Sequence, residues 1–324
     1  MTQPLLDVTD LRVRIGAGDA AIRPVDGVSF HIRRGETFAL LGESGCGKSM
    51  TALALLRLLP QPGGQITGGS VKLDGEELMA LPETGMRSVR GGRIAMIFQE
   101  PMTSLNPVMT VGAQIEESLQ QHQGLRGAAA RQRVVELLDA VGIPDAARRY
   151  GEYPHQLSGG MKQRVMIAIA LAGDPDLLIA DEPTTALDVT IQAQVLELIK
   201  QLQRERGMAV LLITHDLGVV SGMADHVAVM YAGKVMEYTD VKSLYADPKN
   251  PYTIGLLQSI PVLGSKTKGH RLETISGVVP SLLNLPAGCL FSDRCSDVFD
   301  DCRRVAPKMY RVGKNHLVRC LKYA

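Results

Sequence analysis

Residues 42–49 follow the pattern Gly-x-x-x-x-Gly-Lys-Ser, a set of residue types that suits the binding of phosphate groups. Glycines let successive backbone N–H groups turn inward around phosphate oxygens, and the positive end of a following helix adds to the attraction. Lys48 would contact the phosphates as a point charge, and the Ser49 hydroxyl would be a ligand of Mg²⁺. We therefore predict that a nucleotide is bound here by Gly42, Glu43, Ser44, Gly45, Cys46, Gly47, Lys48, Ser49 and Met50.

A second group of reactive side chains follows a run of apolar residues at 177–180. A buried strand that ends in two carboxylates would place Asp181 to hold Mg²⁺, directly or through water. Glu182 would then orient or deprotonate the attacking water. Many strands end in acidic residues, so this pattern alone is weak. Together with a phosphate-binding loop in the same chain, it favours the hydrolysis of a nucleoside triphosphate.

A third group, Leu157, Ser158, Gly159 and Gly160, stands before a helical stretch that contains Gln163. A serine and two glycines at the start of a helix form an N-terminus that can bind an anion. The same residues also suit an ordinary helix start with Ser158 as its N-cap. The residues alone leave both interpretations open.

Alternating strands and helices must position these three groups. Residues 37–41 read as a short apolar strand that runs straight into the glycine-rich loop, and residues 50–59 read as a helix that ends at Pro60. Continuous apolar runs at 177–180 and 210–213 are typical of parallel strands that are buried on both faces. The alternation predicts an α/β fold with a parallel sheet. Other strands are predicted at 5–15, 28–32, 63–75 and 94–98, and helical structure from 111 to 141 with a break at 124–127.

The composition narrows the classes of partner. The chain has 324 residues, and 35 Lys and Arg balance 34 Asp and Glu, which leaves a formal net charge of +1. Proteins that coat nucleic acid usually contain a strongly basic domain, so we expect no nucleic-acid partner. No stretch approaches the roughly 20 apolar residues of a membrane span, and the first residues lack the layout of a secretory signal. We expect a cytosolic protein whose membrane role depends on partner subunits.

In their order along the chain, these motifs resemble those of the ABC-transporter ATPases, over about residues 5–240. Residues 157–160 are similar to the signature motif of that family. Gln99 follows an apolar strand, as the Q-loop glutamine does, and His215 follows another, as the switch histidine does. Ala186, Leu187 and Asp188 stand where the D-loop lies.

The resemblance implies a fold and a composite site. The fold is a P-loop NTPase core with a parallel sheet, an antiparallel β subdomain and a helical subdomain. ATP is held between the phosphate loop of one subunit and the signature residues of its partner, here Leu157, Ser158, Gly159, Gly160 and Gln163. Glu182 would be the general base, and His215 would contact the γ-phosphate. Mg²⁺ would be held by Ser49, Gln99 and Asp181.

One position departs from the family pattern. ABC ATPases usually stack an aromatic ring on adenine near the end of the first strand, and Ile15 stands at about that position here. Aliphatic packing can cover a base, but it loses the geometry of stacked rings. We expect Ile15 to contact the adenine without stacking on it.

Further stretches resemble the oligopeptide and dipeptide importers, most closely their D-type subunit. They are residues 99–107, 153–156, 277–280 and 286–289, and also 250–253, where Asn250 replaces the histidine of a His-Pro-Tyr-Thr motif. The resemblance implies a second, different ATPase subunit, two membrane permeases and an external substrate-binding protein, with this chain on the cytoplasmic face of the inner membrane. Nickel, glutathione and sugar importers share the subfamily, so the cargo stays open between peptides and other small solutes. A soluble ABC ATPase that acts on nucleic acid or ribosomes is the alternative from another class.

Four of the five cysteines, Cys289, Cys295, Cys302 and Cys320, lie near the end of the sequence. Four thiolates suit either Zn²⁺ or an iron–sulfur cluster, although their spacing lacks a close Cys-x-x-Cys pair. The resemblance to the importers implies a [4Fe–4S] cluster, and zinc or unliganded thiols are the alternatives. Cys46 occupies a variable position of the phosphate loop and is interpreted as a small residue that fits there.

The composition changes near residue 247, where prolines become frequent and long periodic runs end. We therefore predict an ABC ATPase domain over residues 1–240, with its helical subdomain at about 100–172. Residues 241–324 are predicted to be an importer-type C-terminal region that carries the four cysteines.

Overall fold

The structure is a computed structural model that describes residues 3–99, 104–185, 188–260 and 274–324. The chain divides into two compact units. The first consists of residues 1–5, 32–36 and 74–212, and the second of residues 6–31, 37–73 and 213–324. Among the described residues, no helix combines the length and apolarity that crossing a bilayer requires.

The first unit is built on buried parallel strands. β6 (Ile94–Ile97) pairs in parallel with β7 (Leu177–Asp181), and β8 (Ala209–Thr214) is the other neighbour of β7. Every residue of β7 and β8 is buried. This confirms the parallel-strand interpretation of the apolar run at 177–180, and it confirms that the run at 210–213 is a buried strand. The unit also contains β5 (Glu76–Glu77), α2 (Glu83–Val89) and α8 (Val189–Arg206).

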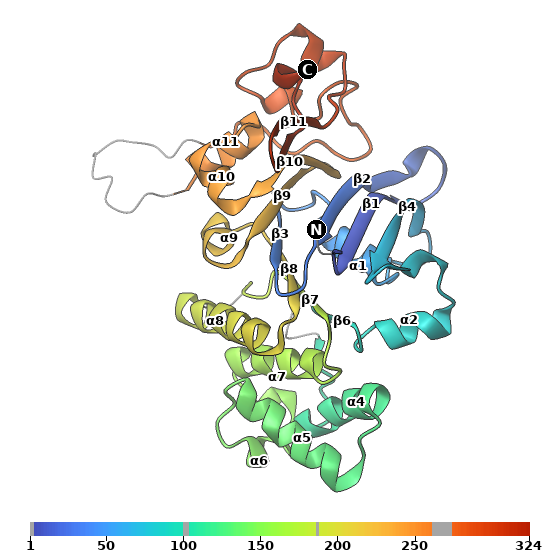
Figure 1. Cartoon of the computed structure of the whole chain (residues 1–324), viewed down its shortest axis with the longest axis vertical. Helices are drawn as coiled ribbons and strands as arrows, with labels where there is room; N and C mark the ends of the chain where they lie inside the picture. The colour runs from blue at the N-terminus through green and yellow to red at the C-terminus, as the bar shows by residue number, and fades with distance from the viewer. Residues whose placement is uncertain (1–2, 100–103, 186–187, 261–273) are drawn as a thin grey trace, which may run out of the picture. The chain divides into compact units, whose positions relative to one another are not determined.

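Four helices of the first unit pack together, as Figure 1 shows. They are α4 (Val111–Gln123), α5 (Gly127–Ala140), α6 (Ala146–Arg149) and α7 (Gly159–Leu171). The break between α4 and α5 falls where the sequence predicts it. Val134 and Leu138 of α5 and Ile115 of α4 are buried in the core of this helical group.

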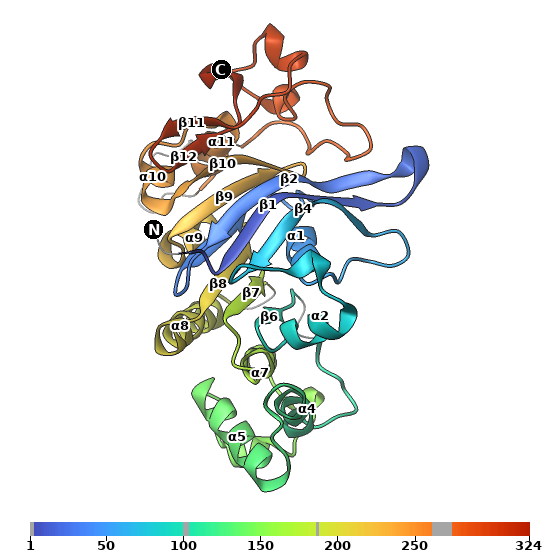
Figure 2. The same ribbon diagram turned by 45° about the vertical axis from the view of Figure 1, so that its right-hand side comes forward.

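The second unit contains a sheet in which β1 lies between β2 and β4 (Figure 2). The strands are β1 (Leu6–Ile15), β2 (Ile22–Ile32) and β4 (Gln65–Leu73). β1 and β4 run antiparallel, with Leu6 opposite Leu73 and Val13 opposite Ile66. Leu6, Val8, Leu11 and Val13 are buried. The register of β1 against β4 shifts between Thr9 and Arg12, which lets Leu6 and Val8 be buried on the same strand as Leu11 and Val13 although simple alternation would separate them.

Strands of the second unit also form the order β11-β12-β10-β9-β3. β3 (Thr37–Leu41) pairs in parallel with β9 (His226–Tyr231), whereas β10 (Lys234–Asp240), β11 (Tyr310–Gly313) and β12 (His316–Val318) pair antiparallel with their neighbours. Helices α9 (Leu217–Met223), α10 (Val241–Ala246) and α11 (Pro251–Gln258) belong to the same unit. Leu41, Val229, Tyr231, Tyr252 and Phe291 share its core.

The helix after the phosphate loop differs from its prediction. α1 spans Lys48–Leu55, whereas the sequence predicts residues 50–59. Arg57 has a φ of 54°, and a residue in this left-handed conformation cannot continue a right-handed helix. Leu56 and Leu59 are buried outside the helix, so their apolar character reflects packing and not helical periodicity.

Candidate functional site

The phosphate loop lies in the second unit, between β3 and α1. Gly47 precedes α1 with a φ of 105°, and a Cβ atom there would lie 1.9 Å from the carbonyl oxygen of Pro24. Only glycine fits such a position. No side chain caps the N-terminus of α1. An uncapped helix N-terminus behind a glycine-rich loop is a suitable place for a phosphate group.

Lys48 is the charged residue of this loop, and its side chain is only slightly exposed. Its Nζ donates hydrogen bonds to the carbonyl oxygens of Gly42, at 2.7 Å, and Glu43, at 3.1 Å. The ammonium group is therefore held over the start of the loop. The second unit resumes at residue 213, near the end of β8, and there His215 is exposed just after the strand; Ile15 is half-buried at the end of β1.

The acidic pair lies in the first unit, where β7 ends. Asp181 is the last residue of β7 and is 4% exposed. Glu182 has a φ of 46°, a left-handed backbone conformation that is uncommon outside glycine and that is concentrated at functional sites. Its Oε2 accepts hydrogen bonds from Gln99 Nε2, at 3.2 Å, and from Thr185 Oγ1, at 2.9 Å. Two donors on different elements thus hold one carboxylate oxygen.

The signature residues lie at the start of α7, also in the first unit. Ser158 is the N-cap of this helix, and its hydroxyl accepts from the Met161 N–H at 3.3 Å. A Cβ atom at Gly159 would meet open space. Gln163 is buried and donates to the carbonyl oxygen of Pro183 at 2.8 Å. The signature helix is therefore tied to the residue that follows Glu182.

The D-loop continues into α8. Asp188 is the N-cap of that helix, and its Oδ1 accepts from the Ile191 N–H at 2.9 Å. Residues 186 and 187 of the predicted D-loop, and residues 100–103 of the stretch after Gln99, lie outside the described residues.

The predicted site residues thus form two groups. The first unit brings together Gln99, Asp181, Glu182 and the signature helix, and the second unit holds the phosphate loop, Ile15 and His215. The union of both groups around one nucleotide stays a prediction.

The four C-terminal cysteines line one cavity of about 20 Å³ in the second unit. This is close to the space that a single water molecule needs. Burial, with a smaller contribution from the three neighbouring cysteines, raises the pKa of the Cys289 thiol to about 11. Burial also raises the pKa of Cys295 and Cys320. Within the described ranges, no three Cys, His, Asp or Glu side chains are placed to hold a metal ion. This arrangement of the described thiols therefore does not support the predicted metal site.

Three residues that contact the site escaped the sequence reasoning. Thr185 donates a hydrogen bond to Glu182. The sequence did offer a signal for this contact, because a hydroxyl three residues after a carboxylate in a turn can bond to it. Tyr252 and Arg294 contact Glu43 of the phosphate loop. No local pattern indicates either contact, because more than 200 residues separate the partners.

Comparisons with known proteins agree over nearly the whole chain. Residues 25–185 match the family described as ABC transporter, and residues 236–302 match the oligopeptide/dipeptide transporter C-terminal region. A putative peptide import ATP-binding protein of Brucella ovis is 51% identical and covers 99% of this chain and 98% of its own length. The oligopeptide transport ATP-binding protein AppD of Bacillus subtilis is 52% identical over 98% of this chain and 97% of its own.

Solved structures agree with the fold. The ATP-binding cassette MJ0796, solved as a dimer in a post-hydrolysis state with ADP and phosphate, has a TM-score of 0.65 at 28% identity. The match covers 73% of this chain and 98% of that one.

Proposed function

The chain belongs to the ABC transporter ATPases that carry the oligopeptide/dipeptide transporter C-terminal region, and from this premise we propose that it powers the import of peptides by hydrolysing ATP. The names of the relatives, peptide import and oligopeptide transport ATP-binding proteins, support the peptide cargo. Import of nickel, glutathione or another small solute is the alternative within the subfamily.

The environment of the Glu182 carboxylate carries the proposal. This group follows the buried Asp181 at the end of a parallel strand, and Gln99 and Thr185 hold one of its oxygens. The other oxygen can accept a proton from a water molecule while the first stays in place. A carboxylate fixed in this way suits a general base.

The remaining residues take roles that follow from their chemistry. The glycine-rich loop and Lys48 bind the phosphates, and Ser49, Gln99 and Asp181 would hold Mg²⁺, which neutralises charge that develops on the γ-phosphate. His215 contacts the γ-phosphate. Ser158 and its neighbouring glycines complete the site of a partner ATPase subunit, so that two subunits close on ATP.

Substitution of Glu182 by Gln tests the proposal. Loss of a general base typically slows a reaction by about 100-fold to 10,000-fold, so we expect ATP binding to persist while turnover in the assembled transporter falls at least about 100-fold. Glu205→Gln is the matched control, because Glu205 is an exposed residue of α8 whose carboxylate accepts a hydrogen bond from Gln201 of the same helix, at 2.7 Å. Near-normal turnover of Glu182→Gln would exclude this residue as the base.

The assembly forms the second part of the proposal. Two permeases, an external binding protein and a second, different ATPase subunit would join this chain at the cytoplasmic face of the inner membrane. Affinity purification of the tagged chain from its own membranes should recover the permeases and the second ATPase. Recovery with ribosomes and without membrane proteins would support the soluble alternative. Loss of dipeptide uptake on deletion of the gene tests the cargo, and unchanged uptake would point to another solute.

We also propose that the four cysteines share one ligand, a [4Fe–4S] cluster, on the strength of the family resemblance and of the single cavity that all four line. Binding would require the side chains to converge and to lose their protons. Protein purified without oxygen should then contain about four iron and four sulfide per chain, as expected for such a cluster. Stoichiometric zinc without iron, or no metal at all, would reject it.

A further inference from the structure

Arg294 belongs to the C-terminal region, yet its side chain ends at the phosphate loop. Its Nη1 donates to Glu43 Oε2 at 2.7 Å, and its Nη2 donates to Oε1 at 3.0 Å. The Arg294 side chain is only 6% exposed, and that of Glu43 is 28% exposed. Two parallel bonds between a planar guanidinium and a carboxylate fix the orientation of both groups.

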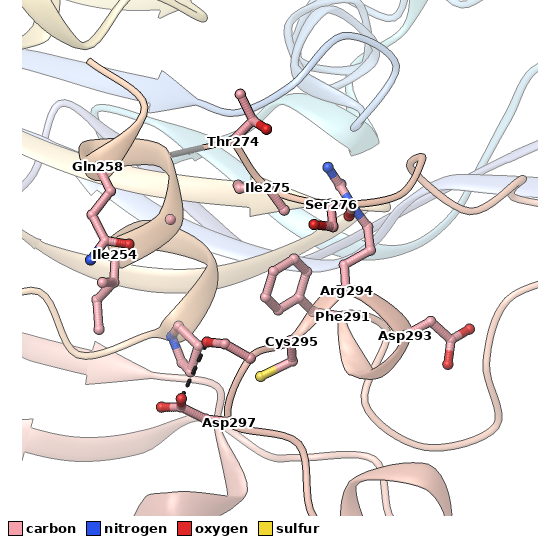
Figure 3. A pocket seen from close by; sticks show the side chains of 13 residues that line it. Ile254, Gln258, Thr274, Ile275, Ser276, Phe291, Asp293, Arg294, Cys295 and Asp297 are labelled. Atoms are coloured by element: carbon pink, nitrogen blue, oxygen red, sulfur yellow. Dashed lines mark hydrogen bonds between the residues drawn. The ribbon is translucent and has the colours of Figure 1, made fainter. Parts of the chain in front are cut away.

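The surroundings of Arg294 hold its guanidinium group in place. Nε donates to the carbonyl oxygen of Ser276 at 3.0 Å. Its Cζ lies 5.7 Å from the ring centre of Tyr231 and 5.9 Å from that of Phe291. Figure 3 shows Arg294 beside Ser276 and Phe291 at the edge of a cavity of about 650 Å³. Cation–π contacts and the bond to Ser276 thus leave the guanidinium little freedom.

A second contact from the C-terminal region reaches the same loop residue. The Glu43 N–H donates to the hydroxyl of Tyr252 at 3.1 Å. Tyr252 is fully buried, and its ring packs against Tyr231 and Phe291 with centroid distances of 4.8 Å and 5.2 Å. Burial raises the pKa of Tyr252, so the hydroxyl keeps its proton. The rings of Tyr231 and Phe291 therefore contact both Tyr252 and Arg294, the two residues that hold Glu43.

The negative charge of Glu43 opposes the binding of phosphate groups by the loop. A carboxylate within a phosphate-binding loop repels a nucleoside triphosphate, and this repulsion is strongest where water is excluded. The bidentate pair with Arg294 neutralises the carboxylate and fixes its direction. Lys48 meanwhile contacts the Glu43 carbonyl oxygen at 3.1 Å, so the backbone and the side chain of Glu43 are both held.

We propose that Arg294 is a positioning residue for nucleotide binding, which acts through Glu43 to hold the start of the phosphate loop in its binding conformation and to cancel the carboxylate charge there. This inference rests on the proposed function, because it assigns the C-terminal region a part in ATP binding. The ATPase of this chain would then depend on a residue of the C-terminal region, which lies beyond the ATPase domain predicted over residues 1–240 and outside the family match at residues 25–185.

The test measures ATP affinity of the purified full chain with a fluorescent ATP analogue and Mg²⁺. Arg294→Met, which approximately keeps the length of the side chain and removes its charge, should weaken binding about tenfold or more, since the phosphate loop then carries an unpaired carboxylate. In the assembled transporter the loss should appear in KM and not in kcat. Arg304→Met is the matched control, because Arg304 is an exposed arginine of the same region that pairs with Asp301, and its affinity should equal that of the wild type.

A double-mutant cycle separates positioning from general support of the fold. The double variant Glu43→Gln with Arg294→Met should bind ATP no more weakly than Arg294→Met alone, because the repelling carboxylate is gone. A double variant whose loss of affinity is the product of the losses of the two single variants would overturn the inference. An Arg294→Met affinity within twofold of the wild type would overturn it as well.

If thermal melts show that Arg294→Met does not fold, Arg294→Lys takes its place. Lysine keeps the charge but not the paired bonds, so binding should weaken about threefold, and an unchanged affinity would overturn the inference. A wild-type chain that does not bind ATP would instead reject the proposed function itself.

Discussion

Asn250 offers a sharp test of how the C-terminal region is held together. This residue is 1% exposed and precedes α11 as its N-cap. Its Oδ1 accepts from the Tyr252 N–H at 3.0 Å, and its Nδ2 donates to the carbonyl oxygens of Met236, at 3.2 Å, and Arg319, at 3.1 Å. The side chain therefore ties the start of a helix to a strand and to the segment after β12.

The cost of each substitution follows from these bonds. Loss of an N-cap costs about 1 kcal/mol, and each lost hydrogen bond costs about 1 kcal/mol more, so Asn250→Ala should destabilise the chain by about 3 kcal/mol. Asn250→Ser keeps the cap and loses the two donors, which gives about 2 kcal/mol. Asn250→Asp keeps the cap as well, but it turns an anionic oxygen toward two carbonyl oxygens. It also places this charge close to the buried carboxylate of Glu237, which accepts from the Asn250 N–H at 3.0 Å.

We therefore expect the order of stability to be Asn, Ser, Ala and Asp, from most to least stable. Unfolding of the full chain in urea at neutral pH, followed by circular dichroism, measures this order. Thr110→Ala is the control, since Thr110 caps α4 through one bond, at 3.3 Å, and should cost only about 1 kcal/mol. An aspartate variant as stable as the wild type would refute the reasoning, because it would show that the two donated bonds contribute nothing.

Two other substitutions address the phosphate loop and the pH dependence of stability. Gly47→Ala should reduce ATP affinity at least tenfold in equilibrium titration, because its Cβ would lie 1.9 Å from the Pro24 carbonyl oxygen. Gly45→Ala is the control: Gly45 has a φ of 79° but open space around it, so this variant should lose less affinity. Equal losses of affinity would contradict the steric argument. Burial alone would raise the pKa of Asp26, but the hydrogen bond and charge of Lys234 outweigh this effect and lower that pKa below its ordinary 3.8. The stabilisation by the Asp26 carboxylate is therefore present above pH 3.8 and lost as the pH falls further. In thermal melts, the difference in melting temperature between the wild type and Asp26→Asn should thus shrink in acid. A difference that stays constant with pH would exclude this linkage.

Local chain chemistry explains which parts of the fold were predictable. The strand before the phosphate loop, the loop itself and the start of the following helix are predictable, because local residue types such as glycine determine the backbone conformation there. The end of that helix did not follow, because the apolar run continues past Leu55 while the backbone turns at Arg57. Apolar side chains record burial, and periodicity cannot separate buried helix from buried turn over so few residues.

Long-range contacts within the site were predictable only where a rule of topology links them. Gln99 and Glu182 meet because both follow strands that are parallel neighbours, and the ends of such strands share one edge of the sheet. The contact between Arg294 and Glu43 has no comparable rule. The sequence places Glu43 in the phosphate loop, but nothing in it distinguishes Arg294 from a surface charge, and only the fold buries the arginine side chain to 6% exposure.

The contacts of Asn250 and Tyr252 explain what the motif at residues 250–253 does in the fold. Asn250 caps α11 and sets its first turn, and that turn carries the Tyr252 hydroxyl to the Glu43 N–H. An N-cap needs an acceptor, and the two carbonyl oxygens need donors, so the asparagine here satisfies both with one side chain. Its substitution should therefore reach beyond stability. If α11 shifts in Asn250→Ala, Tyr252 leaves Glu43, and ATP affinity should fall together with the unfolding midpoint. An affinity that is unchanged in a destabilised Asn250→Ala would show that Arg294 alone holds the loop.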